Sequence, residues 1–155
     1  MRYVEIVGTE GGFYLDPRAY MDELPRLCAA LPPGARSFAT DPGHYDIAGA
    51  THCVKDLGLA GIHFATDGSG GLLLDFAPNR FKHDSGLRIS YSGVTHFSVD
   101  TDSLSINPVL LDEILPEEGG GCLHEIALIN ASITVRCADL QAVWAEQSAT
   151  APRGT

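Results

Sequence analysis

Short segments in which apolar and polar side chains alternate dominate the chain after residue 52. In the clearest of them, Leu87 and Ile89 fall on one side and Arg88 and Ser90 on the other. A period of two is typical of a β-strand that buries one face, because successive side chains of a strand point to opposite faces. With turn-forming glycines between the segments, this pattern predicts strands over residues 2–7, 13–15, 53–66, 71–77, 86–91, 94–99, 122–129 and 132–138.

One helical segment is predicted near the N-terminus, over residues 17–31. Asp16 is a suitable N-cap, and Pro17 suits the first helical position because a proline has no N–H to leave unbonded there. Pro25 interrupts the segment, which predicts either a kink or two short helices, and Pro32-Pro33-Gly34 predicts its end. One face of the segment is apolar and consists of Tyr20, Leu24, Leu27, Cys28 and Leu31.

Two further segments leave alternatives open. Residues 32–50 are rich in Pro, Gly, Asp and Ala and predict a long connection. Because a structureless loop of that length is uncommon in a compact domain, we expect part of it to be a short strand near residues 37–39 or a functional loop. Residues 138–147 hold the single tryptophan, Trp144, and predict either a short helix or a last strand.

The predicted elements follow one another as strand, helix and then a run of strands. Such segregation favours an α+β fold, in which a mainly antiparallel β-sheet of meander or sandwich type carries one N-terminal helical segment on one side. The length of 155 residues fits a single domain. We expect this domain to span residues 1–147 and to be followed by a flexible tail over residues 148–155.

The formal net charge is −10, with 20 acidic and 10 basic residues. A surface this acidic repels phosphate backbones and anionic membranes, so neither nucleic acid nor a membrane is an expected partner. The only local basic cluster, which is too small for a nucleic-acid surface, consists of Arg80, Lys82, His83 and Arg88. The charge fits a basic protein partner, and it also fits plain solubility.

The predicted compartment is the cytoplasm. The apolar run at the N-terminus is too short for the core of a signal peptide, and Glu5 interrupts it. No stretch of the sequence approaches the roughly 18 apolar residues of a membrane span. The cysteines match no zinc or disulfide spacing, so in a reducing cytosol we expect Cys28, Cys53, Cys122 and Cys137 to be small buried hydrophobes.

No motif predicts a catalytic residue, a metal site or a cofactor. Ser69 lies between glycines in a polar turn, whereas a nucleophile elbow needs a strand-to-helix turn. The histidines show neither an HExxH motif nor a structural zinc spacing. These observations favour a protein that is not an enzyme. A site assembled from separate strands stays open, because the sequence does not reveal whether His52, His63, His96 and His124 converge.

Two pairs of carboxylates precede the glycine run at residues 119–121 and form the candidate binding site. They are Asp112 with Glu113 and Glu117 with Glu118. The neighbouring glycines indicate a solvated loop, and the pairs could also form an acidic lip that binds a partner. Acid–base catalysis is the remaining alternative, and it would require one carboxyl in a dry pocket with a raised pKa.

Residues 52–144 resemble a loose group of small bacterial β-rich proteins of uncharacterised function, some of which resemble immunity proteins of contact-dependent or polymorphic toxin systems. The resemblance implies a binding role without catalytic residues, and an acidic chain would suit the neutralisation of a basic nuclease toxin. It is carried by Cys53-Val-Lys-Asp-Leu57, Leu87-Arg-Ile-Ser-Tyr-Ser-Gly-Val94, Leu111-Asp-Glu-Ile114, His124-Glu-Ile126, Ile133-Thr-Val-Arg-Cys137 and Trp144.

Three functions are compatible with the sequence. The first is a non-enzymatic protein-binding domain, of which an immunity-type inhibitor of a basic toxin is one form. The second is a small-molecule-binding or small enzymatic domain with a pocket under the 32–50 loop. The third is an oligomerising structural module whose sheet edge pairs with another copy.

Overall fold

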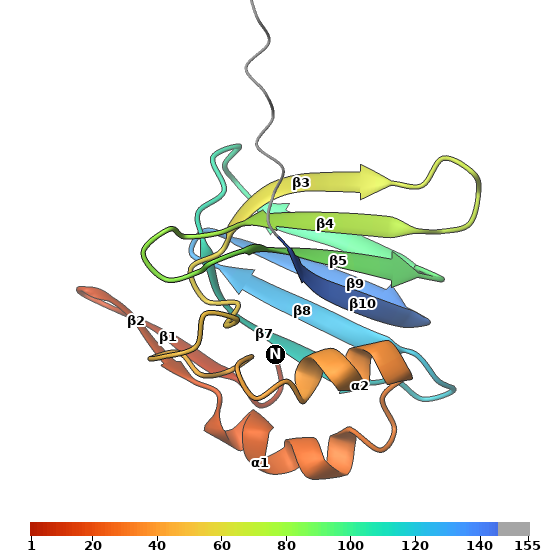
Figure 1. Cartoon of the computed structure of the whole chain (residues 1–155), viewed down its shortest axis with the longest axis horizontal. Helices are drawn as coiled ribbons and strands as arrows, with labels where there is room; N and C mark the ends of the chain where they lie inside the picture. Colours follow the sequence, from red (N-terminus) through yellow and green to blue (C-terminus); the bar gives the residue numbers. More distant parts are fainter. Residues whose placement is uncertain (146–155) are drawn as a thin grey trace, which may run out of the picture.

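The computed structural model describes residues 1–145, which form two helices and ten strands in an α+β arrangement (Figure 1). No helix of this part of the chain is long and apolar enough to cross a membrane. The elements are β1 (Glu5–Thr9), β2 (Gly12–Asp16), α1 (Arg18–Leu27), α2 (Pro33–Ala39), β3 (Gly58–Phe64), β4 (Leu72–Ala77), β5 (Gly86–Ser92), β6 (His96–Thr101), β7 (Val109–Pro116), β8 (Cys122–Leu128), β9 (Ala131–Cys137) and β10 (Asp139–Ala145).

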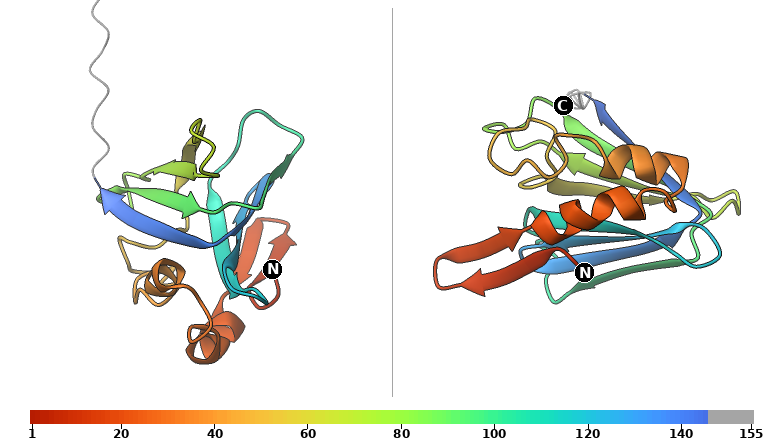
Figure 2. Two further views of the ribbon diagram at one scale, coloured as in Figure 1. Left: turned by 90° about the vertical axis from the view of Figure 1, so that its right-hand side faces the viewer. Right: turned by 90° about the horizontal axis from the view of Figure 1, so that it is seen from below.

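Eight strands form two four-stranded antiparallel sheets, with the orders β10-β5-β4-β3 and β6-β9-β8-β7. Strands β1 and β2 pair only with each other and make a separate antiparallel hairpin. The two helices lie together on one side of the sheets, α2 against β10 and α1 near β7 (Figures 1 and 2). The predicted α+β fold, built mainly of antiparallel sheet, is therefore confirmed.

The side chains that alternate along the sequence point alternately into the core and to the surface. In β5, Leu87, Ile89 and Tyr91 are buried, and the residues between them are exposed. In β8, every second residue from Cys122 to Leu128 is buried. The inner faces of both sheets join one hydrophobic core, to which the helices add residues such as Tyr20 and Phe38. Burial of apolar surface on this scale is the main term that stabilises the fold.

The helical region departs from the prediction at two prolines. Helix α1 runs through Pro25 to Leu27, so the alternative of two short helices at that residue is wrong. Pro33 begins a second helix, α2, where the sequence predicted the end of the helical segment. The alternative of a short strand near residues 37–39 is also wrong, because these residues belong to α2. Proline lacks an N–H, which makes it a poor interior residue but a good first residue of a helix.

A carboxylate from the far end of the chain completes the start of α2. Asp139, at the beginning of β10, accepts hydrogen bonds from the N–H groups of Gly34 and Ala35 at 3.0 and 2.9 Å. Pro32 occupies the N-cap position and makes no side-chain cap. Gly34 lies so close to β10 that an added Cβ would meet the carbonyl oxygen of Leu140. The helix and the strand therefore fix each other in place.

Two more outcomes concern the second half of the chain. The sequence did not predict strand β7. Because Asp112 and Glu113 belong to this strand, they do not lie in the predicted solvated loop. Residues 139–145 form β10, which confirms the alternative of a last strand. The expected tail over residues 148–155 and the last two residues of the expected domain lie outside the described residues.

Candidate functional site

The four carboxylates expected to form one acidic lip occupy three different environments. Asp112 and Glu113 lie within β7 and are each 1% exposed, so the prediction of a solvated lip is wrong for these two. Glu117 is half-buried and pairs with Arg136 of β9. Glu118 is exposed in the turn before the glycine run. A binding role for Glu117 and Glu118 stays a prediction.

Asp112 is the centre of a hydrogen-bonded network buried between the two sheets. Its Oδ1 lies 2.6 Å from Nε2 of His44, and its Oδ2 lies 2.8 Å from Nε2 of His124. The other ring nitrogen of His124 lies 2.8 Å from the hydroxyl of Tyr91 on β5. Nδ1 of His44 lies 2.8 Å from the carbonyl oxygen of Phe38. The network therefore links α2 and the following loop to both sheets.

The partners determine where the protons are. A carbonyl and a carboxylate accept only, so both nitrogens of His44 donate and its ring is an imidazolium. The ring of His124 bridges Asp112, to which its Nε2 donates, and the hydroxyl of Tyr91 at its Nδ1. Burial raises the pKa of Asp112, but the charge of His44 and the hydrogen bonds from both histidines bring it below its ordinary value. Asp112 and His44 thus form a buried ion pair.

Opposite effects act on His44. Burial lowers the pKa of this ring, while the charge of Asp112 and the hydrogen bonds to Asp112 and Phe38 raise it, with a net increase above the ordinary value. His44, Asp112, His124 and Tyr91 are all at most 3% exposed. A group so enclosed reaches no molecule at the surface. We therefore assign this network to stability, although its residue types are those of many catalytic sites.

Glu113 points to the opposite face of β7 and holds the first residues of the chain. Its Oε2 accepts the N–H groups of Tyr3 and Val4 at 2.7 Å, and its Oε1 accepts the N–H of Arg2 at 2.6 Å. Three charge-assisted hydrogen bonds to one carboxylate are strong because the acceptor is ionised. Glu113 therefore sets the place from which the β1–β2 hairpin departs.

The β1–β2 hairpin projects from one end of the molecule (Figures 1 and 2). It exposes large apolar side chains. Phe13 is 41% exposed, Tyr14 49% and Val7 44%. The register pairs Ile6 with Leu15 and Gly8 with Phe13, so Ile6, Leu15 and Phe13 share one face, and Val7 and Tyr14 share the other. A two-stranded hairpin alone is at best marginally stable in water. Its exposed side chains are thus available for a partner.

A groove of about 530 Å³ separates the hairpin from the outer face of the second sheet. Ile6 and Phe13 line its hairpin side, and Glu125 of β8 and Ser132 and Thr134 of β9 line its sheet side. The sheet side also includes apolar residues, Leu110, Ala127 and Ile133 among them, so the lining is mainly apolar with a few polar groups. A groove of this volume has room for a few side chains of a polypeptide segment.

In the part of the chain that the structure describes, several carboxylates of the hairpin and of β6 lack cationic partners, although Glu125, the carboxylate that lines the groove itself, is paired. Within residues 1–145, no basic side chain forms an ion pair with Glu5, Glu10 or Asp100. Asp100 lies opposite Ser132 in the ladder, on the same outer face as the groove. Glu125 binds the amino group of Met1 at 2.5 Å. These unpaired carboxylates and the formal net charge of −10 therefore favour a cationic over an anionic ligand.

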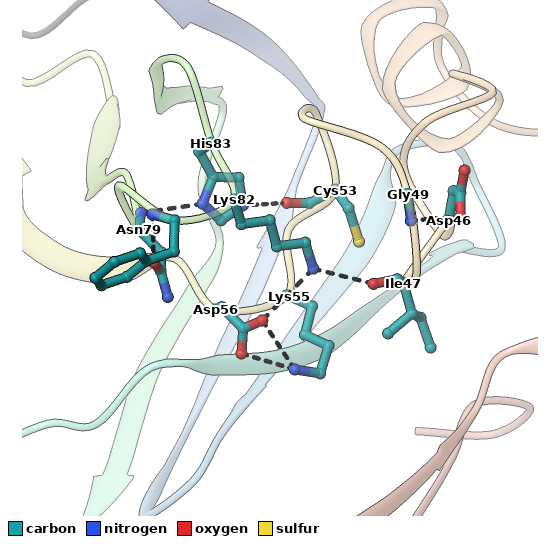
Figure 3. A network of polar contacts seen from close by, with 10 residues as sticks. Asp46, Ile47, Gly49, Cys53, Lys55, Asp56, Asn79, Lys82 and His83 are labelled. Carbon is teal, nitrogen blue, oxygen red and sulfur yellow. Dashed lines mark hydrogen bonds and ion pairs between the residues drawn. The ribbon is translucent and has the colours of Figure 1, made fainter.

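Two members of the basic cluster of the sequence, Lys82 and His83, bond within the protein (Figure 3), whereas Arg80 and Arg88 are exposed. Lys82 lies 3.5 Å from Asp56 and donates to the carbonyl of Ile47, and Lys55 lies 2.7 Å from the same carboxylate. His83 bonds to the carbonyl oxygen of Cys53 at 2.8 Å. Asp56 adopts a positive φ of 74°, which places its carboxylate between the two lysines. This arrangement ties the loops before β3 and β5 together.

The four histidines whose convergence the sequence left open have separate surroundings. His124 is buried in the Asp112 network, His52 stacks on Trp144, and His63 faces Asp75. His96 is exposed on β6. In the described part of the chain, no three His, Cys, Asp or Glu side chains are placed to hold a metal ion.

A second, smaller groove of about 240 Å³ lies between α1 and the segment that follows α2. Leu24 and Cys28 line it from the helix, and Pro42 and Tyr45 line it from the segment. Its position is close to that expected for a pocket under the 32–50 loop. Most of its lining is apolar, and Asp41 is its only carboxylate.

Comparison with known proteins adds no family to this description. No family model matches the chain. No curated protein matches it in a sequence search. The candidate site therefore has to be judged on its own geometry and charge.

Proposed function

We propose that this chain is a protein-binding domain that takes up a cationic segment of a partner protein in the groove between the β1–β2 hairpin and the outer face of β8 and β9. The observation that carries the proposal is the hairpin itself. It projects into solvent with Phe13 and Tyr14 more than two-fifths exposed and with two open strand edges. Exposed apolar side chains rimmed by charge are typical of interaction surfaces.

Charge decides between a partner of another kind and a second copy of this chain. Each copy has a formal charge of −10, and Glu5 and Glu10 stand on the hairpin that would have to pair with its equivalent. Like charges brought together oppose that pairing, whereas lysine and arginine side chains of a partner would neutralise them. The oligomerising module is therefore the less favoured function.

The finer proposal is that the partner is a basic nuclease toxin and that the chain is its immunity protein. It rests on the resemblance of residues 52–144 and on the acidic net charge of the chain. The test is whether a gene beside that of this chain encodes a basic nuclease whose toxicity is suppressed when both are expressed. Equal toxicity with and without this chain would refute the immunity role and leave the binding domain standing.

The binding proposal is tested with a labelled octapeptide in which lysine alternates with valine or leucine. We expect its fluorescence anisotropy to rise on addition of the protein and the affinity to fall with added salt. Phe13→Ser should weaken binding about tenfold, since loss of a buried aromatic anchor costs roughly 1–2 kcal/mol. Phe81→Ser is the matched control because Phe81 is fully exposed in another loop.

Two further peptides complete this experiment. Replacing lysine by glutamate in the peptide should abolish binding through charge, and replacing valine and leucine by serine should abolish it through the loss of apolar contacts. Equal binding of the lysine and glutamate peptides would contradict the proposal. Equal weakening by Phe81→Ser and Phe13→Ser would contradict the placement of the site.

The small groove beside α1 supports a second candidate function, the binding of a small apolar molecule. Cys28 lines this groove, so a bound molecule would shield its thiol. Alkylation of Cys28 by a maleimide in the presence of cyclohexylamine, whose amine would pair with Asp41, provides the test. Slower alkylation than with cyclohexanol supports the function, and unchanged alkylation with both compounds opposes it.

A further inference from the structure

Cys122 and Cys137 lie directly opposite each other on neighbouring strands. The register pairs the two residues across β8 and β9, and their sulfur atoms are 3.6 Å apart. Both side chains are buried, with 0% and 5% of the residue exposed, and both are free thiols. The sequence predicted single buried cysteines from their wide spacing, and the antiparallel pairing of the two strands brings these two together.

We propose that Cys122 and Cys137 are a site of reversible oxidation, at which hydrogen peroxide converts the two thiols into a disulfide that joins β8 to β9. A disulfide requires sulfur atoms about 2.05 Å apart on β-carbons about 3.5–4.5 Å apart. Directly opposed residues of antiparallel strands have β-carbons about 4.5–5.5 Å apart. A small rotation of both side chains and a slight approach of the strands therefore suffice.

The arrangement also assigns a role to each sulfur. The contact between the two sulfur atoms lowers the pKa of Cys137, and the same contact together with burial raises the pKa of Cys122. A thiolate is the form that reacts with peroxide. Cys137 is also the less enclosed of the two, 5% exposed against 0% for Cys122, so we assign it as the thiol that attacks and Cys122 as the thiol that resolves the product.

The reaction balances in two steps. The Cys137 thiolate attacks one oxygen of hydrogen peroxide, the O–O bond breaks, and a sulfenic acid and hydroxide form. The Cys122 sulfur then attacks the sulfenic sulfur, and the hydroxyl of the sulfenic acid leaves with the proton of Cys122 as water. Overall, two thiols and one peroxide give one disulfide and two waters.

The position of the pair explains both how peroxide arrives and what the bond would change. Cys122 is the first residue of β8 and Cys137 the last of β9, so the pair lies beside the glycine turn at the ends of two strands, where local opening costs least. Peroxide is small enough to enter such an opening. The disulfide would close residues 122–137 into a loop and so stabilise the two strands that form the floor of the groove.

The test exposes the folded protein to hydrogen peroxide, blocks the remaining thiols with iodoacetamide and identifies the products by mass spectrometry of the digest. We expect a peptide pair joined through Cys122 and Cys137 that has lost two hydrogens and that dithiothreitol restores. The thermal midpoint of the oxidised protein should be higher. Cys53 is the internal control, since it is buried like the pair, and it should react about tenfold more slowly.

Single-cysteine substitutions show which thiol attacks peroxide and which resolves the sulfenic acid. In Cys122→Ala, the sulfenic acid of Cys137 should persist and react with dimedone, whereas Cys137→Ala should yield no dimedone adduct at Cys122. The proposal is overturned if the pair stays reduced in the folded protein while the half-buried Cys28 is oxidised. It is equally overturned if the disulfide forms only in urea. Both outcomes are read from the unmodified chain, so they do not depend on whether the variants fold.

Discussion

The region around Asp112 buries polar side chains, whereas the β1–β2 hairpin exposes apolar ones. Around Asp112, charged and hydrogen-bonding side chains are buried, and in the described residues no buried side-chain nitrogen or oxygen is left without a partner. In the hairpin, apolar side chains stand in water and both strands have an open edge.

The contrast separates stability from function. A satisfied buried network rigidifies the protein and specifies one arrangement of its elements, yet it has nothing to offer a ligand. An exposed apolar hairpin adds little to folding and leaves its interactions unused until a partner arrives. Substitutions in the two regions should therefore differ in what they change, and four predictions test that difference.

The largest effect is expected for Asp112→Ala. It leaves the His44 imidazolium buried without its counter-charge, and breaking such a pair costs about 3–5 kcal/mol of unfolding free energy. Urea denaturation followed by circular dichroism measures the loss. Asp112→Asn is the matched variant: both rings can then be neutral and hydrogen-bonded, so its loss should be less than half as large. Equal losses of unfolding free energy in the two variants would show that the negative charge of Asp112 stabilises the site and that hydrogen bonds to the two rings do not.

Glu113→Gln should have the next largest effect, about 1.5–3 kcal/mol. The side chain of Glu113 faces three backbone N–H groups, which cannot change their protonation, so the NH₂ group of glutamine would oppose at least one donor. Hydrogen exchange should show faster exchange at the amides of Tyr3 and Val4. Glu118→Gln is the exposed control. Unchanged exchange in Glu113→Gln would refute the anchoring role.

The pH dependence of stability should follow the buried ion pair. Asp112 has a lowered pKa, so its contribution is present above about pH 4 and is lost as pH falls through the folded pKa. His44 has a raised pKa, so its contribution is complete below about pH 6.5 and is lost as pH rises through the folded pKa.

The free energy of unfolding should therefore be greatest between about pH 4 and 6.5 and should fall above that by up to about 1.4 kcal/mol per pH unit. Urea titrations at a series of pH values measure this slope. His44→Gln should flatten it, and His63→Gln, at an exposed position, should not. A slope that survives in His44→Gln would place the titrating group elsewhere.

The smallest effect on stability is expected in the hairpin. Phe13→Ser should change the unfolding free energy by less than about 1 kcal/mol, because the side chain is already 41% exposed. The same variant is the one expected to lose peptide binding. A large destabilisation with unchanged binding would reverse the contrast between the two regions.

The sequence predicted the fold more completely than the site, and β7 shows why. Alternation marked strands such as β5, in which each polar residue faces water. In β7 the polar residues Asp112 and Glu113 are buried on opposite faces, so a carboxylate pair looked like a loop. The signal that could have corrected this was the apolar run Val109-Leu110-Leu111, followed by Ile114 and Leu115.

The start of α2 also could not be predicted from the local sequence. Pro33 looked like the end of a helix because its cap, Asp139, lies 105 residues away from Gly34. The partners of Asp112 are similarly distant, with His44 separated by 68 residues. Local patterns determine strands and turns, but the contacts that convert a proline into a helix start, or a carboxylate into a core residue, form only in three dimensions.

The long reach of Asp139 has a consequence for the order of events during synthesis. At about 5–20 residues per second, a ribosome needs on the order of 5–20 s to travel from Gly34 to its capping carboxylate. During that interval α2, the loop with His44 and the first residues of the chain all await partners encoded further downstream. These N-terminal segments are thus synthesised before the residues that complete their hydrogen bonds. A chaperone would have most to protect during that interval.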